Sequence, residues 1–166
     1  MTNLTTKAII FSQHPYAIKE LWGMTLTEKI LRQLSAAGIE ECIVVSDEEA
    51  GFSSHLRKDF SAWHSIKVKN VKSGESETAT LMAILREDPS SFLVLKGNTI
   101  LDARILDLLI KKGRQGESLQ VETGRKQVPA FILNRESVNS DGLSGSLTEF
   151  LDKVKLTQTS TSEMDT

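Results

Sequence analysis

The stretch GMTLTEKILRQLSAAGIEECIVVS, residues 23–46, decides the fold because a helical pattern passes directly into a strand pattern. Apolar residues first recur at helical spacing, at Leu26, Ile30, Leu31 and Leu34. Thr25 stands three residues before Glu28, which forms a capping box, and Gly38 is a helix stop. The continuous apolar run Cys42–Val45 is typical of a strand buried on both faces. The stretch therefore predicts a helix that begins at Thr25 and ends before Gly38, followed by a buried strand.

The same alternation of short apolar runs and amphipathic segments continues along the chain. Further strands are predicted at 8–11, around 66–71 and at 92–95. Further helices are predicted at about 53–63, 76–86 and 103–112. In the helix over 76–86, we expect Ala79, Met82, Ala83 and Leu85 to face the core. Repeated strand–helix alternation predicts an α/β fold: a three-layer, Rossmann-like, mostly parallel sheet with helices on both faces.

The pattern changes after Gly116. Alternating residues over 119–123 predict an exposed antiparallel strand, and the run Phe131–Leu133 predicts a buried one, so the sheet can gain an antiparallel edge. A last helix is expected over about 146–155. We therefore expect one domain over 1–156 and a polar, disordered tail over 157–166.

Composition excludes several classes of protein. The 166 residues are 39% hydrophobic and 25% charged, with a net charge of −2, which suits one globular domain and disfavours nucleic-acid binding. The basic residues Lys67, Lys69 and Lys72 are expected to form a solvated strand edge. The single cysteine, Cys42, excludes an intrachain disulfide and a multi-cysteine zinc site. No run approaches the roughly 18 apolar residues of a membrane span and no signal peptide is recognisable, so we expect a cytoplasmic protein.

Ligands of such folds bind at the carboxyl ends of the strands. The loops that leave these ends are predicted at 11–23, 46–53, 70–76 and 96–102. The first loop could hold an anion through His14 and Lys19, although it has few glycines for close approach to phosphate. The alternative is a plain surface loop whose Tyr16, Leu21 and Trp22 pack on the edge of the sheet.

Two polar residues follow the strand at 92–95. Asn98 and Asp102 are candidate ligand-binding groups, and the Asp102 carboxylate could bind magnesium on a nucleotide phosphate. The alternative is that Asp102 caps the helix that begins at Ala103, while Asn98 forms an Asx turn.

These segments resemble the nucleotidyltransferase family that makes nucleoside-diphospho sugars and alcohols. The stretch over 23–46 resembles the family's helix, its "AGI" turn and the strand that follows. Gly97, Asn98 and Asp102 occupy the places of the family's Gly-Asp strand end and of a later aspartate. The segment PAFILNRESV, 129–138, resembles a strand and turn that follow the family's central insertion. The resemblance covers about 7–138.

The resemblance implies a reaction in which a phosphorylated alcohol or sugar attacks CTP, or another nucleoside triphosphate, and releases pyrophosphate. It implies a catalytic role for Lys19, which would neutralise phosphate charge, and a magnesium site at Asn98 and Asp102. The nucleotide-binding residues that it implies are Ser12, Gln13, His14, Gly74, Ser76, Thr78 and Gly97.

Several departures from the family make the chain look like a degenerate member. The loop SQHPYAIKELW, 12–22, lacks the family's glycines and arginine, and Asn98 replaces the metal-binding aspartate. The segment GESETAT keeps Gly74 without a second glycine. Two hypotheses remain: an active nucleotidyltransferase that uses Mg²⁺, or a non-catalytic nucleotide-binding or docking domain.

One subgroup of the family is the most similar. Its cytidylyltransferase-like domains are fused to membrane CDP-alcohol phosphatidyltransferases, enzymes of phospholipid biosynthesis. The expected partners are therefore CTP, such a membrane enzyme domain and a second copy of the chain. Within a longer protein, the domain would lie at the cytoplasmic face of the membrane.

Overall fold

The computed structural model describes residues 6–13, 16–47, 52–117, 119–123, 126–133 and 157–160. Its strands are β1 (Thr6–Phe11), β2 (Glu20–Leu21), β3 (Met24–Thr25), β4 (Glu41–Ser46), β5 (Lys67–Lys72), β6 (Ser91–Lys96), β7 (Leu119–Thr123), β8 (Lys126–Leu133) and β9 (Thr157–Ser160). Its helices are α1 (Leu26–Ala36), α2 (Phe60–Trp63), α3 (Glu77–Glu87) and α4 (Ala103–Arg114), and a short 3₁₀ helix, η1, spans Phe52–His55.

The main sheet has seven strands in the order β5-β4-β1-β6-β8-β7-β9. Neighbours from β5 to β6 run parallel, whereas β8 is antiparallel to both β6 and β7. The predicted antiparallel addition is therefore confirmed, although β8 lies inside the sheet because β7 and β9 extend it further. Strands β2 and β3 form a separate hairpin within the connection from β1 to α1.

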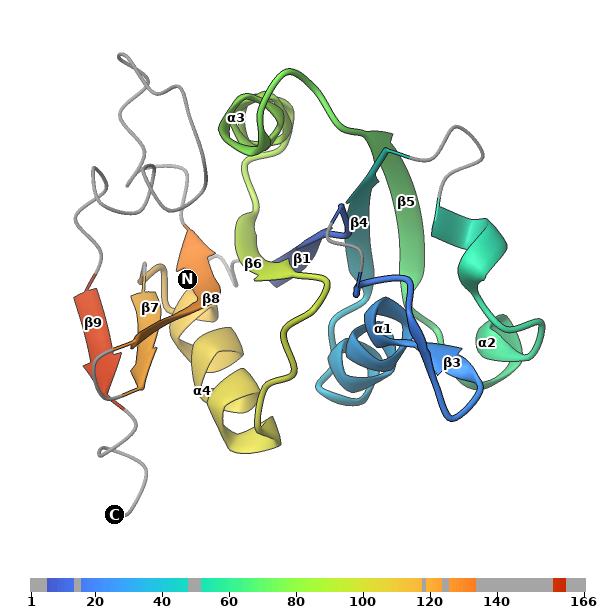
Figure 1. Cartoon of the computed structure of the whole chain (residues 1–166). Coiled ribbons are helices and arrows are strands. Elements are labelled where there is room, and N and C mark those ends of the chain that lie inside the picture. The colour runs from blue at the N-terminus through green and yellow to red at the C-terminus, as the bar shows by residue number, and fades with distance from the viewer. Residues whose placement is uncertain are drawn as a thin grey trace.

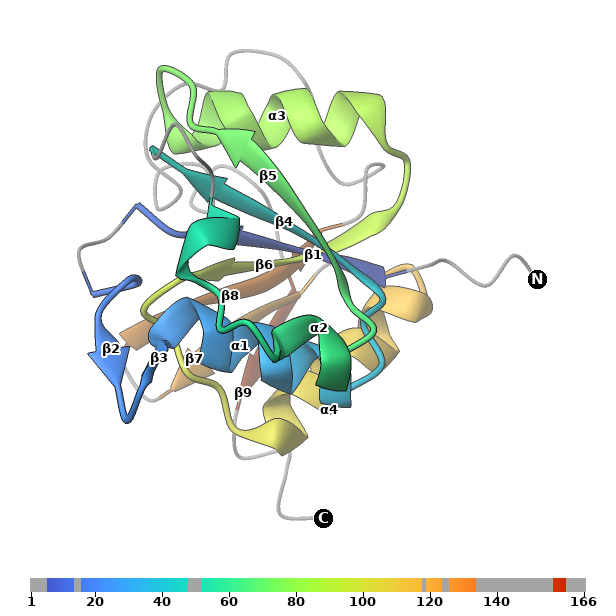
Figure 2. The ribbon, with the colours of Figure 1, turned by 90° about the vertical axis from the view of Figure 1, so that its right-hand side faces the viewer.

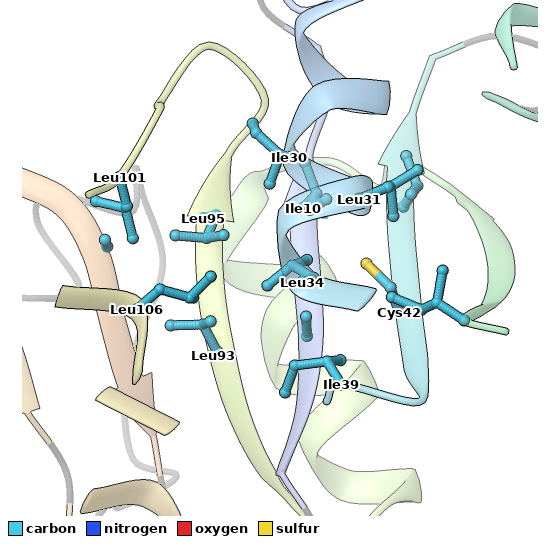
Figure 3. Packing of buried hydrophobic residues seen from close by; sticks show 14 of the residues in the cluster. Ile10, Ile30, Leu31, Leu34, Ile39, Cys42, Leu93, Leu95, Leu101 and Leu106 are labelled. Carbon is cyan, nitrogen blue, oxygen red and sulfur yellow. The ribbon is translucent and has the colours of Figure 1, made fainter. Parts of the chain in front are cut away.

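Helices cover both faces of the sheet, which confirms the predicted three-layer α/β fold. Helices α1, α2 and α4 lie on one side and α3 lies on the other (Figures 1 and 2). Successive residues of β1 serve opposite faces: Ile10 belongs to the cluster under α1 and α4, and Ile9 to the cluster under α3. Figure 3 shows the first cluster, in which Leu31 and Leu34 of α1 lie close to Ile10.

Local signals position α1 as the sequence predicts. Thr25 Oγ1 accepts a hydrogen bond from the Glu28 N–H at 3.1 Å, and Gly38 has the positive φ of +84° that a helix stop requires. In a complete capping box, the Glu28 side chain would accept a hydrogen bond from the Thr25 backbone N–H. Here other groups hold that side chain. Its carboxylate accepts hydrogen bonds from the Arg32 guanidinium and from the Arg57 N–H.

The helix predicted over 53–63 is wrong, since the structure has η1 and the single turn α2 there. Long-range bonds hold both parts of this segment. The Phe52 N–H, at the start of η1, donates to Asn70 Oδ1 at 2.8 Å, and the Arg57 N–H, between η1 and α2, donates to Glu28 Oε2 at 3.0 Å. The bond from Arg57 takes the place of a helical one and accompanies the break between the two short turns.

The buried face of α3 also differs from the prediction. Ala79 and Ala83 are exposed, because the residues that face the sheet begin at Thr78 and continue through Leu81 and Leu85. Met82 and Leu85 are buried as expected.

The later part of the chain is described only in pieces. Strand β9 lies within the segment that we expected to be a disordered tail, where four residues pair in parallel with β7. The helix expected over 146–155 lies outside the described residues. Among the helices that are described, none is long and apolar enough to cross a membrane.

Candidate functional site

The sheet changes its direction of growth at β1. The chain adds β4 and β5 on one side of β1, and then returns through α3 to place β6 on the other side. Ligands of α/β folds bind outside the carboxyl ends of strands at such a switch point. Here the Gly97 N–H donates to the Phe11 carbonyl at 2.8 Å, and the Ser12 N–H donates to the Val45 carbonyl at 2.8 Å. The structure thus brings the predicted residues Ser12 and Gly97 together.

Gly97 allows a close approach of three chain segments. A Cβ atom on this residue would lie 2.8 Å from both Ala17 Cβ and Thr27 Oγ1, and 3.1 Å from Ser12 Cα. Thr27 is fully buried, its Oγ1 donates to the Ala17 carbonyl at 3.1 Å, and the same atom is 3.1 Å from Ser12 Oγ. Sequence reasoning missed Thr27, because only the fold brings the start of α1 against the end of β6.

Gln13 follows Ser12, and its side-chain amide lies in an unusual environment. Its Nε2 donates to Asp47 Oδ1 at 3.3 Å, which joins the ends of β1 and β4. Its Oε1 is buried, and no donor among the described residues reaches it. A buried acceptor without a donor is costly, so it marks a place where a donor is expected.

A positively charged lysine side chain lies at the carboxyl end of β6. Lys96 Nζ is 3.6 Å from Glu77 Oε2, so an ion pair spans the carboxyl end of β6 and the first residue of α3. Ser76, a predicted nucleotide-binding residue, caps this helix, and its Oγ accepts from the Ala79 N–H at 3.0 Å. Sequence reasoning named neither Lys96 nor Glu77, although the last residue of a strand at this edge is a reasonable place to look.

Two further predicted residues of this segment are Thr78 and Gly74. Thr78 is buried. The Gly74 N–H donates to Thr80 Oγ1 at 2.9 Å, and both residues line a cavity of about 400 Å³. The remaining lining residues come from α3, from its end and from the neighbouring strands: Glu41, Ile43, Lys69, Val71, Lys72, Ala79, Ala83, Ile84, Glu87 and Asp88.

The outer part of the first loop turns toward solvent. Lys19 is exposed, and its Nζ lies 5.4 Å from the centroid of the Tyr16 ring. The expectation that Tyr16, Leu21 and Trp22 pack on the sheet edge is wrong, since all three are exposed. Ala17 takes the inward position instead and is fully buried. His14 lies outside the described residues.

Asp102 caps α4, as the second of the two sequence interpretations predicts. Its Oδ1 accepts from the Arg104 N–H at 2.9 Å and from Arg104 Nε at 3.1 Å, while Oδ2 is 3.3 Å from Nη2. The hydrogen bonds from the Arg104 side chain lower the pKa of this exposed carboxyl. Both carboxylate oxygens are therefore engaged by Arg104.

Asn98 is exposed in the turn after β6 and offers a neutral oxygen. Together with an engaged Asp102, it does not make the acidic oxygen set that Mg²⁺ prefers. Within the ranges that the structure describes, no group of three or more His, Cys, Asp or Glu residues is placed to hold a metal ion.

Comparison by sequence finds no relative: neither a protein-family model nor a curated protein matches significantly. Comparison by structure does find similar proteins. Rv0371c from Mycobacterium tuberculosis H37Rv aligns with a TM-score of 0.71 at 14% identity, over 96% of this chain and 89% of that one. Its manganese complex aligns with a TM-score of 0.70 at 13% identity, over 96% and 89% of the two chains.

An enzyme is also among the similar structures. The 4-diphosphocytidyl-2C-methyl-D-erythritol synthase from Anaerococcus prevotii DSM 20548 aligns with a TM-score of 0.69 at 15% identity, over 95% of this chain and 89% of that one. The chain therefore shares the α/β fold of Rv0371c and of this synthase.

Proposed function

We propose that this chain forms a cytidylyltransferase-like domain, with β9 as part of its sheet, that binds CTP at the carboxyl ends of β1 and β6, with weak or lost catalysis. The observation that carries this proposal is the meeting of Ser12, Gln13 and Gly97 at the switch point of the sheet, where Gln13 Oε1 has no donor among the described residues and would reach a ligand after rotation of its side chain. The exocyclic amine of cytosine is a donor of the required kind. The fold supports the choice of nucleotide, since one similar structure is named as a diphosphocytidyl synthase.

The phosphates of the nucleotide would lie toward β6 and α3. Lys96 supplies a positive charge, and its 3.6 Å contact with Glu77 is long enough to exchange for a phosphate oxygen. The first turn of α3 presents backbone N–H groups and the positive end of the helix dipole, which favour an anion.

Weak catalysis follows from the acidic groups that remain. When bound, Mg²⁺ would neutralise the triphosphate charge in this kind of phosphoryl chemistry. Asn98 is neutral and Asp102 is held by Arg104, so these two residues offer it little. One similar structure is a manganese complex, which keeps the active alternative worth testing. In that alternative, an alcohol or sugar phosphate attacks the α-phosphorus of CTP and pyrophosphate leaves.

A domain that binds CTP without strong catalysis would act as a regulatory or docking unit. The resemblance of its sequence to domains fused to CDP-alcohol phosphatidyltransferases supports a membrane enzyme as the partner. Co-purification of this chain with a CDP-alcohol phosphatidyltransferase tests that part, and a partner that elutes separately at all nucleotide concentrations contradicts it.

Calorimetric titration with CTP, with and without magnesium, tests the nucleotide site. We expect binding by the wild type and about tenfold weaker binding by Gln13→Ala and Lys96→Ala, since each loses one polar contact worth about 1.4 kcal/mol. Lys111→Ala is the matched control, because Lys111 is exposed near the end of α4. Absence of CTP binding by the folded wild type overturns the proposal. Release of pyrophosphate well above background, with phosphorylated alcohols present, overturns the loss of catalysis.

A further inference from the structure

The connection from β1 to α1 presents an unusual number of large apolar side chains to solvent. Tyr16 is 55% exposed, Ile18 38%, Leu21 41% and Trp22 90%. Among the residues whose side-chain exposure the structure describes, the one other exposed large hydrophobic residue is Ile100. Four of these five residues thus lie within a single stretch of seven residues, 16–22. Concentrated apolar exposure of this kind marks an interaction surface.

Trp22 stands at the tip of this stretch in a conformation that tryptophan rarely adopts. It has φ +53° and Gly23 has φ +80°, so the two-residue turn between β2 and β3 is left-handed at both positions. Asn-Gly is the usual sequence for such a turn. Trp22 is the only described residue other than glycine with a positive φ. The turn thus holds its largest side chain outward at a conformational cost, which suggests a role for that side chain.

The exposed stretch is firmly anchored. The Thr27 N–H and Thr27 Oγ1 both donate to the Ala17 carbonyl, each at 3.1 Å, and Ala17 is fully buried. In Figure 2 the hairpin of β2 and β3 lies at the margin of the molecule, beside the start of α1. The hydrogen bonds to Ala17 therefore hold the stretch in place, and its apolar side chains project away from the core.

Lysines flank both aromatic rings. Lys19 Nζ lies 5.4 Å from the Tyr16 ring centroid, and Lys29 Nζ lies 5.8 Å from the Trp22 ring centroid. The acidic residue of the stretch, Glu20, precedes Leu21 in β2, and successive strand residues face opposite sides. The surface therefore has an apolar centre with a positively charged rim.

We propose that this hairpin surface, formed by Tyr16, Ile18, Leu21, Trp22, Lys19 and Lys29, inserts into an anionic lipid surface. Tryptophan and tyrosine favour the boundary between lipid headgroups and acyl chains, and nearby lysines pair with anionic headgroups. A lipid surface requires no complementary shape from its ligand. A protruding apolar tip with a basic rim is sufficient, and the hairpin offers that arrangement. The inference is independent of CTP binding.

The chain contains two tryptophans, so Trp63→Phe leaves Trp22 as the sole fluorescent reporter. Vesicles of phosphatidylcholine are compared with vesicles in which part of that lipid is replaced by phosphatidylserine. We expect a blue shift of the Trp22 emission and co-sedimentation with the phosphatidylserine vesicles, both reduced by added salt. Trp22→Asn keeps a favourable turn sequence and should lose most of the binding.

The lysines provide a second measurement. Lys19→Gln and Lys29→Gln should each weaken vesicle binding about fivefold, whereas Lys111→Gln should not change it. The proposal is overturned if the Trp22 emission does not move with phosphatidylserine vesicles, or if Trp22→Asn binds them as the wild type does. It is also overturned if Trp22 becomes buried in a concentration-dependent dimer without lipid, since a second copy is then the partner.

Discussion

Arg32 holds the fully buried carboxylate of Glu28 one helical turn away, with Nη2 2.6 Å and Nε 3.0 Å from the same oxygen, Oε1. The other oxygen accepts from the Arg57 N–H at 3.0 Å. Arg32 Nη1 also lies 3.2 Å from His64 Nε2. One buried acid therefore ties α1 to the segment between η1 and α2.

Removal of Arg32 should destabilise the fold strongly. Arg32→Ala leaves the Glu28 carboxylate buried without its ionic partner, and we expect a loss of about 3 kcal/mol in the free energy of unfolding. Urea unfolding measures it. Arg86→Ala, at an exposed position of α3, is the control and should stay within about 0.5 kcal/mol of the wild type. Equal losses in the two variants would contradict the role of the buried pair.

Gly97→Ala should affect both stability and CTP binding. The added methyl group would meet Ala17, Thr27 and the Ser12 backbone at 2.8–3.1 Å, so the first loop must shift. We expect a loss of about 1–3 kcal/mol in unfolding free energy and weaker CTP binding. Asn98→Ala, at the exposed neighbouring position, should change stability little. Wild-type stability in Gly97→Ala would show that the loop is not packed there as described.

Variants of Asp102 distinguish a helix-capping role from a metal-binding role. Asp102→Ala should lower the melting temperature, because α4 loses its cap, whereas Asp102→Asn keeps a capping side chain and should lower it less. Thermal unfolding measures both. If magnesium improves CTP binding in the wild type, it should do so equally in Asp102→Asn. Loss of the magnesium effect in that variant would make Asp102 a metal ligand.

The Lys7–Asp88 pair should contribute to stability at neutral pH and stop contributing in acid. Lys7 Nζ lies 2.7 Å from Asp88 Oδ2. Burial raises the pKa of Asp88, but the hydrogen bonds from Lys7 and Ser90 outweigh it, so the net pKa is lowered. A carboxyl with a lowered folded-state pKa stabilises the fold above its unfolded pKa and loses that contribution as the pH falls below about 4.

Asp88→Asn should therefore be about 1 kcal/mol less stable than the wild type at pH 7, with the difference shrinking as the pH falls below about 4 and through the lowered pKa of Asp88. Denaturant unfolding across this range measures it. Asp107→Asn, at an exposed position of α4, should show no such difference. A gap between Asp88→Asn and the wild type that persists in strong acid would contradict the ion pair as its cause.

Much of the fold could be predicted because its signals are local. Thr25, Ser76 and Asp102 each begin a helix with a side-chain cap, and each stands directly before an amphipathic segment. The region 52–63 could not be predicted this way. Asn70 bonds the start of η1 and Glu28 bonds the residues between η1 and α2, and both are distant in sequence and meet this region only in the folded chain.

The candidate site was predictable in place but not in detail. Parallel strands put Ser12 and Gly97 at one edge, as their positions after apolar runs indicate. Thr27 reaches Gly97 across 70 residues of sequence, and no periodicity marks that contact. The resemblance directed attention to Asn98 and Asp102, yet Lys96 and Glu77 form the ion pair at this edge.

The terminal strand β5 has one further consequence. Lys67, Lys69 and Lys72 are all exposed along it, and among the described strands only β4 pairs with it, on one side. A second molecule approaching this open side strand against strand would bring lysine toward lysine, and the repulsion would oppose growth of the sheet from one molecule into the next. The three lysines of this solvated edge therefore oppose aggregation of the domain through β5.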